Sequence, residues 1–435
     1  MMWLSVCRMV TAVSAGAVAI PVILAGTLSP AASAGPPAPG AVLAWNQITV
    51  RTDLAARQTN QEGVLHLAYV QAAVFDAVDA VDGGYRPYVG PLRAHGVTDG
   101  DAAVAAAAHR VLVTQFAGQA AALDADYAAA LAAIPDGPAK ARGIALGEQA
   151  ATDLLRARAS DGFEASVPYT FGSGPGVWIL PTDNPVTTPA TPWVAKMRPF
   201  VLHAADQFRP GPPPALTSAA YTASYRETTA YGSAASVVRS PEQTDTALFW
   251  GLGRPDAQYN QGIRGIIGSA GMNRIQAARA LALAGLVTAD AYIACFDAKY
   301  AYSAWRPYTA IRAGGTDGNP ATIADPAWTP LVKTPNHPEY PANHACVTTS
   351  YTTTIDYLLG RRHFTLTVSG VPASTSEPRR FMRAPVDSSE STTRPFRFSL
   401  ARISSSAVAG CSCRCASSAP TTDSASLTLS GRVPT

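Results

Sequence analysis

KYAYSAWRP (residues 299–307) and HPEYPANH (residues 337–344) are the two stretches that decide the fold of this chain. Lys299 and Arg306 lie seven residues apart, so a helix over 286–305 would project both cations from one face, about two turns apart. The proline after Arg306 disfavours helical dihedrals and predicts that the helix ends there. The second stretch predicts a proline-rich loop that runs into a helix, which puts His344 near a helix N-terminus, where backbone N–H groups favour an anion.

The three residue types in these stretches suit a tetrahedral oxoanion. Arg306 can bind two oxygens with its forked guanidinium, Lys299 supplies a compact charge, and His344 exchanges a proton near neutral pH. We therefore predict that the three side chains converge in one pocket. Because a forked donor loses two charge-assisted bonds, we expect the pocket to depend more on Arg306 than on Lys299.

The spacing K-x6-R-P followed by P-x-x-H resembles the first two motifs of the superfamily of vanadium-dependent haloperoxidases and type 2 phosphatidic acid phosphatases. The first motif matches in full at residues 299–307. The second matches at Pro341 and His344, with Ala342 and Asn343 where the commonest form has Ser-Gly. The alanine-rich segments before the motifs are similar to those of the soluble, secreted bacterial branch of the superfamily.

The resemblance and the residue chemistry together predict a set of site residues. His344 is predicted to be the catalytic acid–base. The predicted oxoanion-binding residues are Lys299, Arg306 and Asn343, and further pocket residues are Trp305, Tyr308 and His337.

The third motif of the superfamily, S-R-x5-H-x3-D, is missing. The chain has no histidine after His363. If residues 396–399 correspond to the aromatic-Arg stretch that often follows the family histidine, Pro395 holds the histidine position and Ser389 the arginine position. No metal-ligating residue is therefore identifiable in this sequence.

Three functions stay open at this point. The first is an exported haloperoxidase, which would use vanadate as its cofactor and oxidise halide with hydrogen peroxide. The second is a secreted acid phosphatase that hydrolyses phosphomonoesters and needs no cofactor, since vanadate imitates a phosphoryl transition state and similar pockets serve both. The third is a non-catalytic oxoanion-binding relic. Without the third-motif arginine and histidine, we expect turnover near background for this chain.

Composition limits the partners. The chain has 435 residues, of which 47% are hydrophobic and 14% charged, and its net charge is +3. These values predict a sizeable core and give no reason to expect a nucleic-acid partner. A small-molecule substrate or an oxoanion is the expected partner, and the sequence carries no indication of the oligomeric state.

The N-terminus predicts export. Arg8 precedes an apolar run, and Ala32-Ser33-Ala34 fits a cleavage site for a secretory signal over residues 1–34. Residues 35–41 form a Gly/Pro-rich linker. We expect a secreted protein with no stable membrane insertion after cleavage.

The rest of the chain predicts a mainly α helical bundle over residues 42–370, in which residues 160–214 form a long loop or lid rich in proline and aromatic residues. Residues 371–435 are atypical and predict either disorder or a frameshifted tail. The expected helices are 42–53, 64–81, segments within 101–134, 139–159, 218–230, a start at 244–250, 273–302, and one from His344 to Gly360.

Two cysteines flank the motifs. Cys295 lies four residues before Lys299, and Cys346 lies two residues after His344. Converging motifs would bring the two thiols close, so either a disulfide or a pair of buried free thiols is expected. Three more cysteines near the C-terminus lack the neighbouring histidine or carboxylate that a four-ligand metal site needs.

Overall fold

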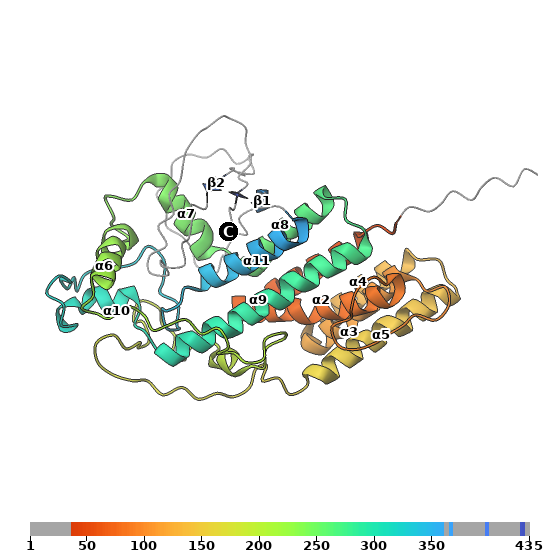
Figure 1. Cartoon of the computed structure of the whole chain (residues 1–435), viewed down its shortest axis with the longest axis horizontal. Coiled ribbons are helices and arrows are strands. Elements are labelled where there is room, and N and C mark those ends of the chain that lie inside the picture. The colour runs from red at the N-terminus through yellow and green to blue at the C-terminus, as the bar shows by residue number, and fades with distance from the viewer. Residues whose placement is uncertain (1–35, 361–364, 369–395, 400–426, 431–435) are drawn as a thin grey trace, which may run out of the picture. The chain divides into compact units, whose positions relative to one another are not determined.

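A computed structural model of the chain describes residues 36–360, 365–368, 396–399 and 427–430 (Figure 1). Helices make up most of the described chain, which confirms the mainly α prediction. The α-helices are α1 (Gly40–Ala55), α2 (Asn60–Asp82), α3 (Gly100–Gln115), α4 (Ala120–Ala132), α5 (Pro138–Arg158), α6 (Ala219–Gly232), α7 (Pro241–Leu252), α8 (Pro255–Ser269), α9 (Arg274–Tyr302), α10 (Pro307–Arg312) and α11 (Asn343–Leu359). The short 3-10 helices are η1 (Ala117–Gln119), η2 (Pro192–Lys196) and η3 (Gly314–Thr316).

Three short strands complete the described chain. They are β1 (Thr365–Val368), β2 (Phe396–Ser399) and β3 (Leu427–Ser430), in the order β1-β3-β2, with β1 antiparallel and β2 parallel to β3. The predicted signal over residues 1–34 lies outside the described residues. So does the predicted tail over residues 371–435, apart from β2 and β3.

Local capping explains why α2 begins at Asn60, four residues before the predicted start at residue 64, and ends at Asp82. The Thr59 side chain accepts a hydrogen bond from the Glu62 backbone, while the Glu62 carboxylate accepts one from the Thr59 N–H at 2.7 Å. This reciprocal capping satisfies two N–H groups that have no partner inside the helix. At the other end, Gly83 adopts a positive φ of 68°, which a residue without a side chain does at little cost.

The helix that carries Lys299 ends at Tyr302, as the predicted range 273–302 has it, and does not continue to residue 305. Ser303 takes a left-handed conformation directly after it. The reason is pairing with the long loop: the Trp305 N–H donates to the Gly176 carbonyl at 2.9 Å, and the Trp178 N–H donates to the Ser303 carbonyl at 2.8 Å. The helices α8 and α10 are additions that the sequence patterns did not predict.

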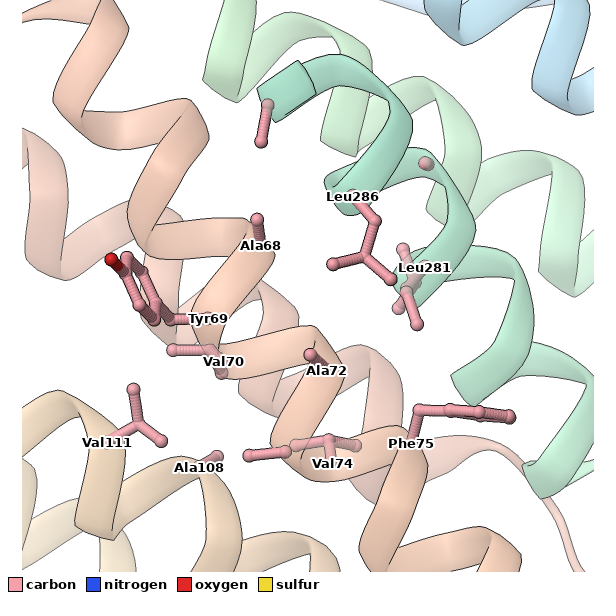
Figure 2. Close-up of a cluster of buried hydrophobic side chains, with 14 of the residues drawn as sticks. Ala68, Tyr69, Val70, Ala72, Val74, Phe75, Ala108, Val111, Leu281 and Leu286 are labelled. Atoms are coloured by element: carbon pink, nitrogen blue, oxygen red, sulfur yellow. The ribbon is translucent and has the colours of Figure 1, made fainter. Parts of the chain in front are cut away.

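The core lies where α2 packs between α9 on one side and α3 and α5 on the other (Figures 1 and 2). Figure 2 shows Val74 of α2 near Ala108 of α3, and Leu281 and Leu286 of α9 turned toward α2. Small residues let these helices approach closely. On α9, a Cβ placed on Gly285 would lie only 3.2 Å from the Ala68 Cα.

Two carboxylates on α9 hold the long loop against the bundle. Asp290 is buried and accepts three backbone N–H bonds from residues 200–202, at 2.6 to 2.8 Å. Seven residues later, about two turns along α9, Asp297 makes a two-point ion pair with Arg209, at 2.6 and 2.8 Å. A carboxylate that is buried with this many donors is stabilised, so the loop over residues 160–214 is fixed to the helix that carries Lys299.

Two helices, α2 and α9, are long and apolar enough to cross a membrane by length and composition. Both are mostly buried inside the protein, which is also what the central helices of a bundle require.

The contact between α3 and α5 generates a stability prediction. A Cβ on Gly147 would fall 2.3 Å from the Ala103 carbonyl oxygen and 2.8 Å from the Ala107 nitrogen. Because both are backbone atoms, the helices must separate, and we expect Gly147→Ala to lower the free energy of unfolding by about 1–3 kcal/mol.

The matched control is Gly265→Ala on α8, where an added Cβ meets no atom within 4 Å. There the substitution is expected to raise the free energy of unfolding by about 0.5–1 kcal/mol, through helix propensity alone. Urea unfolding of both variants measures the difference. Equal effects of the two substitutions would contradict the close packing of α3 on α5.

Candidate functional site

Lys299 is a buried cation in the last turn of α9. Its side chain is only 1% exposed, and its ammonium donates to the carbonyls of Pro338 at 3.0 Å and Glu339 at 2.7 Å. Burial lowers the pKa of Lys299 to about 8, since a charge is disfavoured where water is excluded. The nearby Arg306 charge lowers it further, and Glu339 opposes the shift. Lys299 therefore ties the second motif to the first.

Arg306 reaches the same loop from a different element. It precedes α10 with extended dihedrals (φ −82°, ψ 152°), as the following proline predicted. It therefore does not share a helical face with Lys299, and that part of the prediction is wrong. Its Nε donates to the His337 carbonyl at 2.6 Å, its Nη1 donates to Glu339 Oε2 at 2.6 Å, and its Nη2 lies 2.8 Å from His337 Nδ1.

Glu339 is the site residue that the sequence reasoning missed. Its backbone carbonyl accepts from Lys299 and its carboxylate accepts from Arg306, so it is the common partner of the two cations. Burial raises the pKa of Glu339, but the charges of Arg306 and Lys299 outweigh it and hold that pKa below its usual value. The sequence did offer one indication of this role: Glu339 is a carboxylate inside the stretch over residues 337–344, which was predicted to bind an anion.

His337 is folded inward and buried. Its ring lies against the Arg306 guanidinium and has its centroid 5.4 Å from that of Phe296. Burial and the charges of Arg306 and Lys299 hold the pKa of His337 well below its ordinary value. The imidazole is therefore neutral at physiological pH, and it orients Arg306.

His344 lies in the first turn of α11, as predicted. Its Nε2 is 3.2 Å from the Trp250 carbonyl oxygen, and its ring packs edge-on against the Trp250 indole. Although the residue is exposed overall, loss of water around the ring lowers the pKa of His344, and the positive charges of Lys299 and Arg306 lower it further.

The N-terminus of α11 has no side-chain cap, because the residue before it is Ala342. Its first helical hydrogen bond runs from the Cys346 N–H to the Ala342 carbonyl at 3.2 Å. The preceding N–H groups of a helix have no partner inside it, and with the helix dipole they favour a negative charge. His344 therefore lies at the electropositive end of a helix.

The other predicted site residues have local partners. Asn343 turns its Oδ1 toward the Cys295 thiol, at 3.2 Å. Trp305 is buried and pairs with the long loop through its backbone. Tyr308 places its hydroxyl 2.7 Å from Thr182 Oγ1, under the stacked guanidinium of Arg312.

Lys299 and Arg306 thus both donate to the loop that carries His337, and His344 follows that loop in the first turn of α11. At neutral pH the two cations face one carboxylate, that of Glu339, so positive charge is in excess. Among the described residues, no group of three His, Cys, Asp or Glu side chains could hold a metal ion. The arrangement can bind an anion by charge and by hydrogen bonds.

Comparisons with known proteins match this fold. Residues 279–411 match the family described as the VCPO second helical-bundle domain. Vanadium chloroperoxidase from Curvularia inaequalis is 31% identical over 172 residues, which are 32% of this chain and 28% of that protein, so the chain spans about a quarter of that relative's length.

Two kinds of solved structure are similar. The first bacterial vanadium-dependent iodoperoxidase has a TM-score of 0.63 at 22% identity, with 76% of this chain and 83% of that chain covered. An apo-type bacterial vanadium-dependent chloroperoxidase has a TM-score of 0.54 at 18% identity, with coverages of 72% and 81%. The described helices therefore have the vanadium haloperoxidase fold.

The shared carboxylate generates the next prediction. Glu339→Gln keeps the shape of the side chain but removes the charge that Arg306 and Lys299 face. Leaving two neighbouring cations without a counter-charge should lower the free energy of unfolding by about 1–2 kcal/mol at neutral pH.

Asp136→Asn is the matched control, because Asp136 pairs with Lys140 at 2.8 Å on the surface with its side chain 97% exposed. Little change is expected there. Chemical denaturation at low and high salt separates the two cases. A Glu339→Gln protein as stable as the control would show that the Glu339 carboxylate does not balance the cations.

Proposed function

We propose that this vanadium haloperoxidase-like protein is exported and binds vanadate or phosphate at Lys299, Arg306, Asn343 and His344. One observation carries the proposal: two cations, Lys299 and Arg306, are buried together around a single carboxylate. Burying like charges is costly unless something compensates them, and a bound oxoanion would supply the missing negative charge.

The residues fit such an anion in charge and in donor number. The described hydrogen bonds use two of the three protons of the Lys299 ammonium. The uncapped start of α11 adds backbone donors at Asn343 and His344. Glu339 competes for Arg306, so anion binding would be coupled to the release of that ion pair.

Vanadate held in this way would supply the capacity to accept hydrogen peroxide and oxidise a halide. The chain's own contribution would be to neutralise the charge through Lys299 and Arg306 and to exchange a proton at His344. Relatives named as iodoperoxidase and chloroperoxidases favour halide oxidation over phosphomonoester hydrolysis as the reaction of this fold. A small-molecule substrate is the partner we propose, with no nucleic acid and no stable membrane insertion.

Lys299 gives the anion site a pH dependence that can be measured. Its ammonium, with a pKa of about 8, loses its charge as pH rises through that value. The charged fraction falls about tenfold between pH 7 and pH 9, so phosphate affinity is expected to fall by about the same factor. Calorimetric titration of the protein with inorganic phosphate measures this change.

Lys299→Arg is the matched variant, because a guanidinium stays charged over this range. Phosphate itself also changes protonation between pH 7 and pH 9, but this affects both proteins equally. Comparing the two pH profiles therefore isolates the contribution of the Lys299 charge. A clearly flatter pH profile in Lys299→Arg is the expected result. Parallel profiles, or no phosphate binding at any pH, would contradict a role for the Lys299 charge in an oxoanion site.

We also expect this chain to have turnover near background, even with vanadate bound. The sequence lacks the arginine and histidine of the third motif. Each well-placed donor contributes roughly 3–4 kcal/mol, or about 10² to 10³ in rate. Bromide oxidation by peroxide, with and without added vanadate, is the measurement, with phosphomonoester hydrolysis assayed in parallel. Ser389 and Pro395 stand at the positions of the third-motif arginine and histidine, and neither side chain can do their chemistry. If bromide is nevertheless oxidised, and His337→Ala abolishes that activity, His337 replaces the missing histidine.

A further inference from the structure

Beside the cation cluster, α9 and α11 run antiparallel and bring two thiols together. Three contacts fix the register: Thr288 Oγ1 to Ser350 Oγ at 3.0 Å, Cys295 Sγ to Asn343 Oδ1 at 3.2 Å, and Lys299 Nζ to the Glu339 carbonyl at 2.7 Å. Along α9 the contacts are at residues 288, 295 and 299, which are seven and then four apart. Along the partner segment they are at residues 350, 343 and 339, with the same spacing in the opposite direction. This is the spacing of one face of a helix.

In this register Cys295 faces Asn343, and Cys346 lies three residues further along α11, about one turn away on the same side of that helix. Both cysteines are free thiols, and they lie close enough for each to shift the pKa of the other. Cys295 is 3% exposed, whereas Cys346 is half-buried and within reach of a small solute. Cys295 is therefore the buried thiol of the pair, and Cys346 is the more exposed one.

The surroundings make the two thiols unequal. The hydrogen bond from Cys295 lowers the pKa of Cys346, and the charge of Lys299 lowers it further. Burial and the neighbouring sulfur raise the pKa of Cys295 well above its usual value. Both shifts favour Cys346 as the nucleophile, and its side chain is also the more exposed of the two, so we take Cys295 as the resolving thiol.

We infer that Cys346 and Cys295 form a peroxide-reactive thiol pair, in which Cys346 is oxidised first and Cys295 then closes a disulfide between α9 and α11. The inference goes beyond the proposed function, because it depends only on the two thiols and on hydrogen peroxide as oxidant. Vanadate takes no part in it.

The reaction balances in two steps. The Cys346 sulfur attacks one oxygen of hydrogen peroxide, the O–O bond breaks, and the second oxygen leaves as hydroxide and is protonated to water, which leaves a sulfenic acid. The Cys295 sulfur then attacks the oxidised sulfur, an S–S bond forms, and the thiol proton leaves with the hydroxyl group as a second water. The two cysteines lose two electrons, and the peroxide gains them.

The disulfide would tie the first turn of α11 to α9. That turn of α11 carries His344. On α9, Lys299 lies four residues, or about one turn, after Cys295. Oxidation would therefore fix the spacing between the helix N-terminus and the buried ammonium.

The test is peptide mapping of the full chain by mass spectrometry after exposure to hydrogen peroxide, without reduction and with all remaining thiols alkylated. The expected result is one cross-linked pair of peptides containing Cys295 and Cys346, with loss of alkylation at both. A control protein with Cys411→Ser, Cys413→Ser and Cys415→Ser should give the same pair. Failure of both proteins to form it, or Cys346 linked only to a C-terminal cysteine, would overturn the inference.

Two single variants test the order of events. In Cys295→Ser, Cys346 has no resolving partner, and a 1,3-dione that traps sulfenic acids should label it. In Cys346→Ser, the 1,3-dione should not label Cys295, because Cys295 does not react with peroxide directly. Labelling of Cys295 in the second variant and none of Cys346 in the first would overturn the assigned roles. Since neither readout involves anion binding, failure here leaves the proposed function unaffected, and failure of phosphate binding leaves this inference unaffected.

Discussion

The buried ammonium of Lys299 is the constraint on which the rest of the site depends. A charge that is 1% exposed must be compensated by hydrogen bonds, and here two consecutive carbonyls, those of Pro338 and Glu339, do this. Their position fixes the loop before α11. The same loop presents the His337 carbonyl and the Glu339 carboxylate to Arg306, and it sets the point at which α11 begins. One interaction thus relates two motifs that lie some forty residues apart.

This arrangement also explains why Glu339 matters for an anion site. Two cations and one carboxylate form a cluster with an excess of positive charge. Under the proposed function, an anion would compete with Glu339 for Arg306, while Lys299 and the start of α11 would stay available to it. The affinity for the anion would therefore depend on two sets of charge-assisted hydrogen bonds. One set forms between the anion and its donors, and the other is lost when the ion pair between Arg306 and Glu339 opens.

The sequence predicted most helices well, but it did not predict the tertiary contacts between the segments that carry the site residues. Helical periodicity, Gly83 and Gly360 placed α2 and the end of α11, and the proline after Arg306 predicted its extended backbone. The predicted range 273–302 gave the end of α9 correctly. The left-handed turn at Ser303 was missed, because it depends on pairing with residues 176–178, which is a tertiary effect. Glu339 was missed for a similar reason, since only the fold shows that both cations turn toward one loop. The roles of Asn343, Trp305 and Tyr308 in binding stay predictions.

The central claim is that an oxoanion binds between Lys299 and the N-terminus of α11. The most direct measurement is a crystal structure of the full chain soaked with vanadate, with the anion located by its anomalous scattering. The account predicts one strong peak within hydrogen-bond reach of the Lys299 ammonium and the backbone N–H groups at Asn343 and His344, with the Glu339 carboxylate moved off Arg306. Vanadate bound only elsewhere, with the ion pair between Arg306 and Glu339 intact, would contradict it.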